Sequence, residues 1–377
     1  MINITLPDGN IKSFEKAPTG LDVAKSISEG LARNCVAMDL DGKLVDLDTV
    51  ISTDSGVRLI TTGNREALEI LRHSAAHVMA QAILSIYRDA KLTIGPVVED
   101  GFYYDIDMEP VSKEDFDKIE AEIRRIISAK IPFKRKEVSK NDALDFYKNE
   151  PYKLEMISDL KDGTISLYEQ GDFTDLCRGP HLPHTGFIKA IKLMKVSGAY
   201  WRADQTKAQL QRIYGTAFFS KKELDDHLHF IEEAIKRNHR RIGVALDLFS
   251  FHDEAPGMPF FHPKGMNVWG ALIDYWKAEH RAAGYVETKT PIMLNRSLWE
   301  RSGHWDNYRE NMYTSVVDEI EYAIKPMNCP GGMLLYAMKP HSYKDLPLRA
   351  AEIGLVHRHE LSGVLSGLFR VRAFHQD

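Results

Sequence analysis

The spacing of hydrophobic residues divides the chain into stretches of different period. Short strand-like runs occupy residues 2–6, 11–14, 35–38, 44–45 and 57–61. Turn sequences at residues 7–9 and 41–42 separate these runs, and a short helix is predicted at residues 21–26. Strands and one helix in this order predict a small ubiquitin-like β-grasp domain. Cys35 lies in an apolar stretch and is expected in the core.

From Glu66 the hydrophobic period becomes that of a helix. Apolar residues recur every three or four positions at 68, 71, 75, 78 and 83. His73 and His77 are four positions apart, so they share one face of this helix. Two imidazoles at this spacing can hold a metal ion or a water molecule, although paired histidines on a helix also occur in purely structural roles.

A second pair of ligand-type residues follows later in the chain. Cys177 and His181 are also four positions apart, but Gly179-Pro180 between them argues against a regular helix. Together the four side chains could form a zinc site. They could equally surround a catalytic water, with histidines as acid and base. The residues alone leave both alternatives open.

The rest of this region has the pattern of a sheet. Residues 94–107, 192–201 and 210–214 are predicted to form strands of one sheet, and Tyr103 and Tyr104 stand there beside acidic residues. With the helix before them, these strands predict an α+β domain.

A charged amphipathic helix is predicted at residues 221–241, where it would bridge two domains. A further helix at residues 266–279 ends before a glycine at 284. Residues 285–293 then read as one extended strand that carries Pro291, and a proline there favours a sheet edge or an interface. The aromatic residues between 299 and 308 are expected to pack together.

The last residues of the chain predict two antiparallel strands, at 353–356 and 371–374, joined by a glycine-containing loop. Arg358, Arg370 and Arg372 gather near this hairpin. A guanidinium group matches phosphate oxygens and keeps its charge, and Phe374 can stack on a base. The hairpin therefore suits a bound nucleotide, or else it is a charged hairpin on an ordinary surface.

Composition sets broad limits on these expectations. The chain has 377 residues, 44% of them hydrophobic and 27% charged, which is enough for two or three domains. Its net charge of -5 gives no global attraction to nucleic acid, so an RNA-binding surface would need a local basic patch such as residues 236–241. Three widely spaced cysteines fit a reducing compartment, and we expect neither a signal peptide nor a membrane span.

Several of these segments resemble motifs of one enzyme family. Arg358-x-Glu360, the loop and Arg372-x-Phe374 resemble motif 2 of class II aminoacyl-tRNA synthetases, and GYVETKTP at 284–291 resembles motif 1. KPMNCPG at 325–331 is similar to a signature of the threonyl-tRNA synthetase family. RHSAAH at 72–77, CRGPH at 177–181, GAYWR at 198–202 and QRIYGT at 211–216 are similar to the editing domain of that family.

The resemblance covers the chain from Met1 to Asp377 and implies an α+β multidomain architecture. It implies a ubiquitin-like β-grasp TGS domain at 1–62, an α+β editing domain at 63–224, a linker helix at 225–243 and the start of a class II antiparallel-sheet catalytic domain at 244–377. The implied activity is ATP-dependent activation of threonine and its transfer to tRNA(Thr), with hydrolytic editing of Ser-tRNA(Thr). The implied partners are tRNA(Thr), threonine, ATP with Mg²⁺ and a second copy in a cytoplasmic homodimer.

The editing residues carry over one by one. The family's site corresponds to His73, His77, Cys177 and His181, with Lys153 and Asp175 at supporting positions. Serine lacks only a methyl group of threonine, and a missing methyl is worth roughly 1–3 kcal/mol, which is too little for faithful translation without a second site. We hypothesise that the first two histidines position a water, while Cys177 and His181 hold the tRNA 3′ end.

The catalytic-domain residues are assigned in the same way. By resemblance, Arg358 contacts the α-phosphate of ATP, Glu360 lies near the adenine or its amine edge, Phe374 stacks on the adenine and Gln376 lines the substrate pocket. Arg370 and Arg372 belong to the same ATP-binding set.

Cys329 corresponds to one of three protein ligands of a single Zn²⁺ ion, and the other two ligands would lie beyond Asp377. We do not assign His375 as a ligand, and Ala373 replaces the family's more usual glycine. Motif 3 and an anticodon-binding domain are absent from the sequence, so residues 1–377 are expected to activate threonine poorly. A stand-alone editing deacylase and a non-catalytic RNA-binding regulator are the alternative interpretations.

Overall fold

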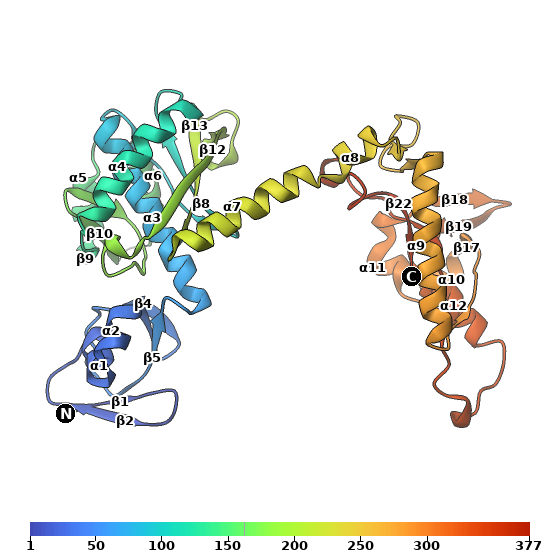
Figure 1. The fold of residues 1–377 in the computed structure, drawn as a ribbon, viewed down its shortest axis with the longest axis horizontal. Helices are drawn as coiled ribbons and strands as arrows, with labels where there is room; N and C mark the ends of the chain where they lie inside the picture. The colour runs from blue at the N-terminus through green and yellow to red at the C-terminus, as the bar shows by residue number, and fades with distance from the viewer. Residues whose placement is uncertain (162) are drawn as a thin grey trace. The chain divides into compact units, whose positions relative to one another are not determined.

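The computed structural model describes residues 1–161 and 163–377. It divides the chain into two compact units, Met1–Ile231 and Glu232–Asp377, each with hydrophobic clusters of its own (Figure 1). Among the described residues, no helix is long and apolar enough to span a membrane. The proposed division into four segments is finer than these two units and stays a prediction.

The N-terminal part of the first unit has the predicted β-grasp arrangement. Its elements are β1 (Ile2–Thr5), β2 (Ile11–Phe14), α1 (Gly20–Ile27), α2 (Glu29–Asn34), β3 (Cys35–Leu40), β4 (Lys43–Asp46) and β5 (Ser55–Thr61). The strand order is β2-β1-β5-β3-β4, with β1 and β5 parallel. Thr19 and Asp22 form a capping box that starts α1. Cys35 is fully buried, which confirms its expected place in the core.

The second part of this unit is built on the long helix α3 (Arg65–Ile86). A five-stranded sheet lies against it, formed by β6 (Lys91–Leu92), β7 (Val97–Val98), β8 (Gly101–Asp107), β12 (Ala190–Tyr200) and β13 (Gln209–Phe218). Helix α3 contacts β8 and β13, and α4 (Phe116–Ser128) contacts both α3 and β12 (Figure 1). The large cluster between them includes Leu71, Met79, Phe102 and Ile106, so apolar burial fixes the helix on the sheet.

A smaller three-stranded sheet completes the first unit. It has the order β11-β10-β9 and contains β9 (Lys134–Ser139), β10 (Thr164–Gln170) and β11 (Phe173–Leu176). Two short helices, α5 (Lys140–Phe146) and α6 (Pro151–Ser158), pack beside it and beside β6. Pro151 begins α6, where the missing N–H costs nothing. Strand β11, the loop that follows it, and helices α3 and α6 supply most of the side chains of the candidate site.

Helix α7 (Lys221–Lys236) crosses the boundary between the units, and here one prediction was wrong. The sequence predicted one helix through residue 241, but a second helix, α8 (His239–Ala245), begins after a break. Asn238 leaves the helical backbone conformation, with ψ at 109°, and its side chain accepts the Arg240 N–H at 3.0 Å. Asparagine is a strong N-cap, so it starts a new helix instead of continuing the old one.

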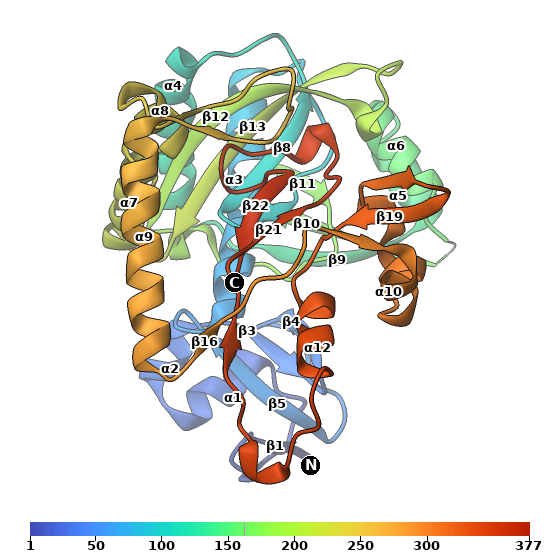
Figure 2. The ribbon, with the colours of Figure 1, turned by 90° about the vertical axis from the view of Figure 1, so that its right-hand side faces the viewer.

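The second unit is organised around α9 (Pro263–Ala282), a helix of 20 residues. Figure 2 shows this helix on one side of the unit and the sheet of β17 (Met293–Asn295), β18 (Thr314–Val317) and β19 (Ile320–Ile324) on the other. Other elements of this unit are β14 (Phe249–Ser250), β15 (Phe260–Phe261), α10 (Arg296–Arg301), α11 (His304–Tyr308), α12 (Cys329–Tyr336), β21 (Gly354–His357) and β22 (Ala373–Gln376).

The stretch at 285–293 is not the single strand that the sequence predicted. Only β16 (Val286–Glu287) forms there, parallel to β20 (Ala350–Ala351), and β17 starts at Met293. Pro291 lies between the two strands, where its lack of an N–H removes a ladder hydrogen bond. The predicted aromatic packing is confirmed, because Trp299 and Trp305 are buried in a cluster with Met312. The chain is thus a mixed α and β protein, as predicted.

Candidate active site

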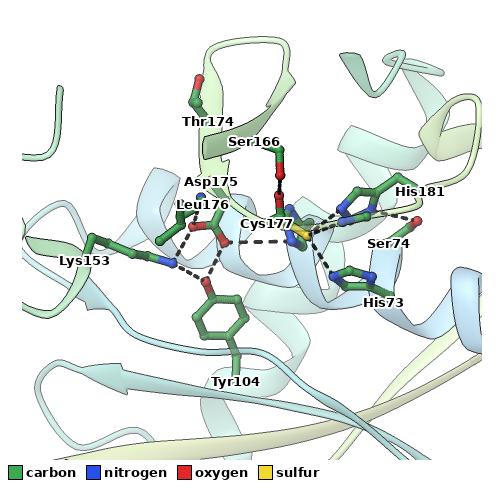
Figure 3. A network of polar contacts seen from close by, with 12 residues as sticks. His73, Ser74, Tyr104, Lys153, Ser166, Thr174, Asp175, Leu176, Cys177 and His181 are labelled. Atoms are coloured by element: carbon green, nitrogen blue, oxygen red, sulfur yellow. Dashed lines mark hydrogen bonds and ion pairs between the residues drawn. The ribbon is translucent and has the colours of Figure 1, made fainter. Parts of the chain in front are cut away.

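Four ligand-type side chains from two distant segments meet in the first unit. His73 and His77 come from α3. Cys177 and His181 come from the loop that follows β11, and Figure 3 shows them beside His73. The Cys177 Sγ atom lies 3.1 Å from His73 Nε2 and 3.3 Å from His181 Nε2. The donor atoms of the four residues all lie within 4.8 Å of one another, so this set has the spacing to hold a metal ion.

The backbone of the CRGPH loop is shaped by glycine. Gly179 has a φ of +70°, and a Cβ placed on it would lie 1.8 Å from the Tyr168 hydroxyl oxygen. Its N–H donates to Cys177 Sγ at 3.3 Å, and the Cys177 N–H donates to the Ser166 carbonyl oxygen at 3.3 Å. The left-handed backbone and the close aromatic neighbour both require glycine at this position. The turn that Gly179 permits brings His181 back toward α3.

A buried ion pair lies next to the histidines. Lys153 Nζ is 2.5 Å from Asp175 Oδ1, and the two side chains are 3% and 2% exposed. Tyr104 donates its hydroxyl hydrogen to Asp175 Oδ2 at 2.6 Å, and the Leu176 N–H donates to Oδ1 at 2.8 Å (Figure 3). Burial raises the pKa of Asp175, but Lys153 and the hydrogen bonds outweigh it and lower the pKa overall. Asp175 is therefore a carboxylate.

The histidines are neutral and the cysteine is a thiol. Burial lowers the pKa of His77 to about 3 and also lowers the pKa values of His73 and His181. Burial raises the pKa of Cys177 to about 12. At neutral pH the imidazoles therefore have a lone pair that can accept a hydrogen bond from water, although the lowered pKa makes them weaker bases. The cysteine is protonated and is a poor nucleophile.

Several contacts of the site were missed in the sequence. Asp46, at the end of β4, accepts the backbone N–H of His181 at 2.8 Å through Oδ1 and the Tyr168 hydroxyl at 2.6 Å through Oδ2. From the sequence, Tyr104 was noted only as a neighbour of acidic residues. The alternation of side chains along a strand could have placed Tyr104 and Tyr103 on opposite faces of the sheet. Nothing in the sequence links Asp46 to a loop so far along the chain.

A cavity of about 330 Å³ opens beside Cys177. Apolar side chains such as Met156, Leu160 and Leu176 line it together with Ser166 and Arg178. Its volume lies in the range of small-molecule sites, and apolar walls with a few polar groups are typical of them.

The hairpin of β21 and β22 in the second unit brings most of the predicted ATP residues together. Val356 pairs with Phe374, and the Arg358 guanidinium lies 5.1 Å from the Phe374 ring centroid. Arg370 pairs with the Glu360 carboxylate at 3.0 Å, and Arg372 Nε donates to the Glu360 carbonyl oxygen at 2.9 Å.

Gln376 lies at the end of this hairpin, and its Oε1 atom is buried without a hydrogen-bond partner among the residues that the structure describes. Cys329 is exposed at the first position of α12. Within the described part of the chain, Cys329 belongs to no group of three or more candidate metal ligands. These residues therefore do not by themselves make a zinc site.

Three family models match separate parts of the chain. They are described as TGS domain at residues 2–61, threonyl and alanyl tRNA synthetase second additional domain at 165–214, and tRNA synthetase class II core domain (G, H, P, S and T) at 313–377. These matches support the predicted fold class, because the three domains follow one another along the chain in the predicted order.

Curated relatives match over the whole chain. Threonine–tRNA ligase of Desulforapulum autotrophicum is 72% identical over 377 residues, which is 100% of this chain and 59% of the relative. Threonine–tRNA ligase of Clostridioides difficile is 54% identical over 381 residues, or 100% of this chain and 60% of the relative. The chain thus spans about three fifths of the length of these relatives.

Proposed function

We propose that the first unit of this chain hydrolyses the ester of mischarged Ser-tRNA(Thr), because the chain belongs to the threonyl-tRNA synthetase family. The observation that carries this proposal is the meeting of His73, His77, Cys177 and His181 beside the Lys153–Asp175 pair. Neutral imidazoles next to a fixed carboxylate suit proton transfer from water to a base. The adjacent cavity offers room for the end of an RNA strand, and Arg178 brings a positive charge to it.

In the proposed reaction, a water oxygen bonds to the ester carbonyl carbon and the ester C–O bond then breaks. His73 and His77 position this water, and an imidazole takes its proton. The ribose oxygen leaves with a proton, so the products are free serine and uncharged tRNA. Cys177 and His181 hold the tRNA 3′ end, and Lys153 and Asp175 support the site through Tyr104 and His77.

We further propose that the chain is the N-terminal portion of a threonine–tRNA ligase that activates threonine with ATP and Mg²⁺ and transfers it to tRNA(Thr). Arg358, Glu360 and Phe374 bind ATP together with Arg370 and Arg372, and Gln376 lines the threonine pocket. The contact of Arg358 with the Phe374 ring supports this assignment, because it places a guanidinium that can bind phosphate beside a ring on which an adenine can stack. A homodimer in the cytoplasm and one Zn²⁺ ion held by Cys329 with residues outside this chain complete the proposal.

The test is release of serine from Ser-tRNA(Thr) by residues 1–377, with Thr-tRNA(Thr) as the control substrate. We expect selective release of serine, and we expect His73→Ala to abolish it. His229→Ala is the matched control variant, because His229 is an exposed histidine on α7. Equal release from both tRNAs, or full activity of His73→Ala, would overturn the assignment.

A further inference from the structure

Ser74 lies between the two segments of the site and is completely buried. It follows His73 on α3, and its Oγ atom lies 3.0 Å from His181 Nδ1 (Figure 3). The backbone N–H of Leu182 donates to the same Oγ atom at 3.0 Å. One hydroxyl thus contacts both the ring of His181 and the backbone of the next residue.

The protons of these contacts can be counted. A backbone N–H can only donate, so Ser74 accepts from Leu182. The buried hydroxyl must also donate its own proton. Within the described part of the chain, His181 Nδ1 is the one acceptor found at hydrogen-bond distance from Ser74 Oγ. Nδ1 therefore carries no proton, and the neutral ring carries its proton on Nε2.

This tautomer sets which groups donate and which accept in the hydrogen bonds among His181, Cys177 and His73. The Nε2–H of His181 points to Cys177 Sγ, 3.3 Å away, and Gly179 also donates to this sulfur. The thiol then directs its proton to His73 Nε2, at 3.1 Å. His181 is thus a hydrogen-bond donor toward the centre of the site, whereas His73 is an acceptor.

Two aromatic neighbours of the His181 ring, Phe133 and Tyr168, hold its plane but cannot choose its tautomer. Phe133 stacks on the ring at a centroid distance of 4.9 Å, and Tyr168 meets it edge-on at 4.5 Å. Neither aromatic face distinguishes Nδ1–H from Nε2–H. The choice is left to the hydrogen bond at Nδ1.

We propose that Ser74 is a positioning residue that keeps His181 in the Nε2–H tautomer, so that an oxygen of the ester being hydrolysed can take over the donor that points to Cys177 Sγ when no ester is bound. This inference rests on the proposed editing function. A fixed donor aimed at an oxygen that gains negative charge stabilises the transition state. The opposite tautomer would present a lone pair to that oxygen and would repel it.

The first measurement is the histidine ¹⁵N spectrum of residues 1–377, in which the two neutral tautomers give distinct nitrogen shifts. His181→Gln identifies the resonances of His181. We expect the Nε2–H form in the unsubstituted chain and a mixture of tautomers in Ser74→Ala, because both Nδ1 and the Leu182 N–H then lose their partner. A proton on Nδ1 in the unsubstituted chain would overturn the inference.

The second measurement is deacylation of Ser-tRNA(Thr) by the same proteins. Ser74→Ala should lower kcat about tenfold with little change in KM, the order expected for loss of one buried hydrogen bond. Ser74→Thr, which keeps the hydroxyl, should retain most of the rate and the tautomer. Ser85→Ala is the matched control, because Ser85 lies on the same helix and donates to the Ala82 carbonyl oxygen.

The two proposals can fail separately. If the unsubstituted chain releases no serine, the editing function is wrong, and the ¹⁵N spectrum still decides the role of Ser74. If it releases serine and Ser74→Ala keeps both the rate and the Nε2–H form, the inference is wrong and the editing function stands. If Ser74→Ala does not fold, the spectra of the unsubstituted chain and of Ser74→Thr still show which nitrogen of His181 carries the proton, and a proton on Nδ1 in either would overturn the inference.

Discussion

Removal of the Lys153 charge should destabilise the first unit strongly. Lys153 Nζ lies 2.5 Å from Asp175 Oδ1, and both side chains are almost completely buried. Lys153→Met would leave Asp175 as a buried charge without its partner. Breaking a buried pair in this way costs about 3–5 kcal/mol, which is a large part of the roughly 5–15 kcal/mol that holds a typical domain together.

The assay is urea unfolding of residues 1–377 at pH 7, followed by a signal from the first unit. Lys91→Met is the matched control, because Lys91 pairs with Glu150 at 2.9 Å while both side chains are about one third exposed. An exposed pair of this kind contributes about 0–1 kcal/mol. Lys153→Met/Asp175→Leu, which removes both charges, should recover much of the lost stability and remain inactive in deacylation.

The dependence on pH gives a sharper check of the same pair. In the unsubstituted chain the pKa of Asp175 is lowered, so its contribution is present above the unfolded pKa and is lost as pH falls through the folded pKa. Without Lys153, burial dominates and raises the pKa of Asp175, so protonation relieves the buried charge. The destabilisation by Lys153→Met should therefore shrink as pH falls. Equal effects of Lys153→Met and Lys91→Met, or a pH-independent effect, would refute this reasoning.

Three further predictions concern the same site. Asp46→Ala should reduce deacylation about tenfold, because the His181 N–H and the Tyr168 hydroxyl each lose an acceptor; unchanged kinetics would contradict it. Gly179→Ala should destabilise the chain by at least about 2 kcal/mol in urea unfolding, since the added Cβ meets Tyr168. Burial lowers the pKa of His77 to about 3, so below pH 6.5 this residue binds more protons in the unfolded chain and by itself lowers the free energy of unfolding by about 1.4 kcal/mol for each unit that the pH falls. His77→Gln should reduce the measured slope by that amount and leave the contributions of His73 and His181.

Local periodicity predicted the parts of the site that lie on regular elements. The four-residue spacing of His73 and His77 places both on one face of α3, and Gly179-Pro180 correctly argued against a helix through Cys177. The sequence also predicted that three strand segments share one sheet, and β8, β12 and β13 do so. The zinc and water alternatives remained open because residue types at a given spacing do not report protonation or hydrogen-bond direction.

The parts that the sequence did not predict depend on long-range contacts or on register. Asp46 reaches His181 across more than a hundred residues of sequence, and no local pattern encodes that contact. Tyr103 and Tyr104 are neighbours, yet they point to opposite faces of β8. Tyr104 reaches Asp175, whereas Tyr103 lies under the Arg212 guanidinium at 4.0 Å. Only the register of β8 in its sheet decides which tyrosine belongs to the site.

The protonation states of the site also bear on how an ester would be cleaved there. A covalent route through Cys177 would need a thiolate, but burial raises its pKa to about 12 and Asp175 adds to that effect. The nearest base, His73, has a pKa lowered by burial, so transfer of the thiol proton to it would create two charges in an apolar setting. Direct attack by water avoids this charge separation before the ester carbonyl is engaged. Cys177 then acts through its hydrogen bonds to His73 and His181, and its replacement by serine should preserve more activity than replacement by alanine.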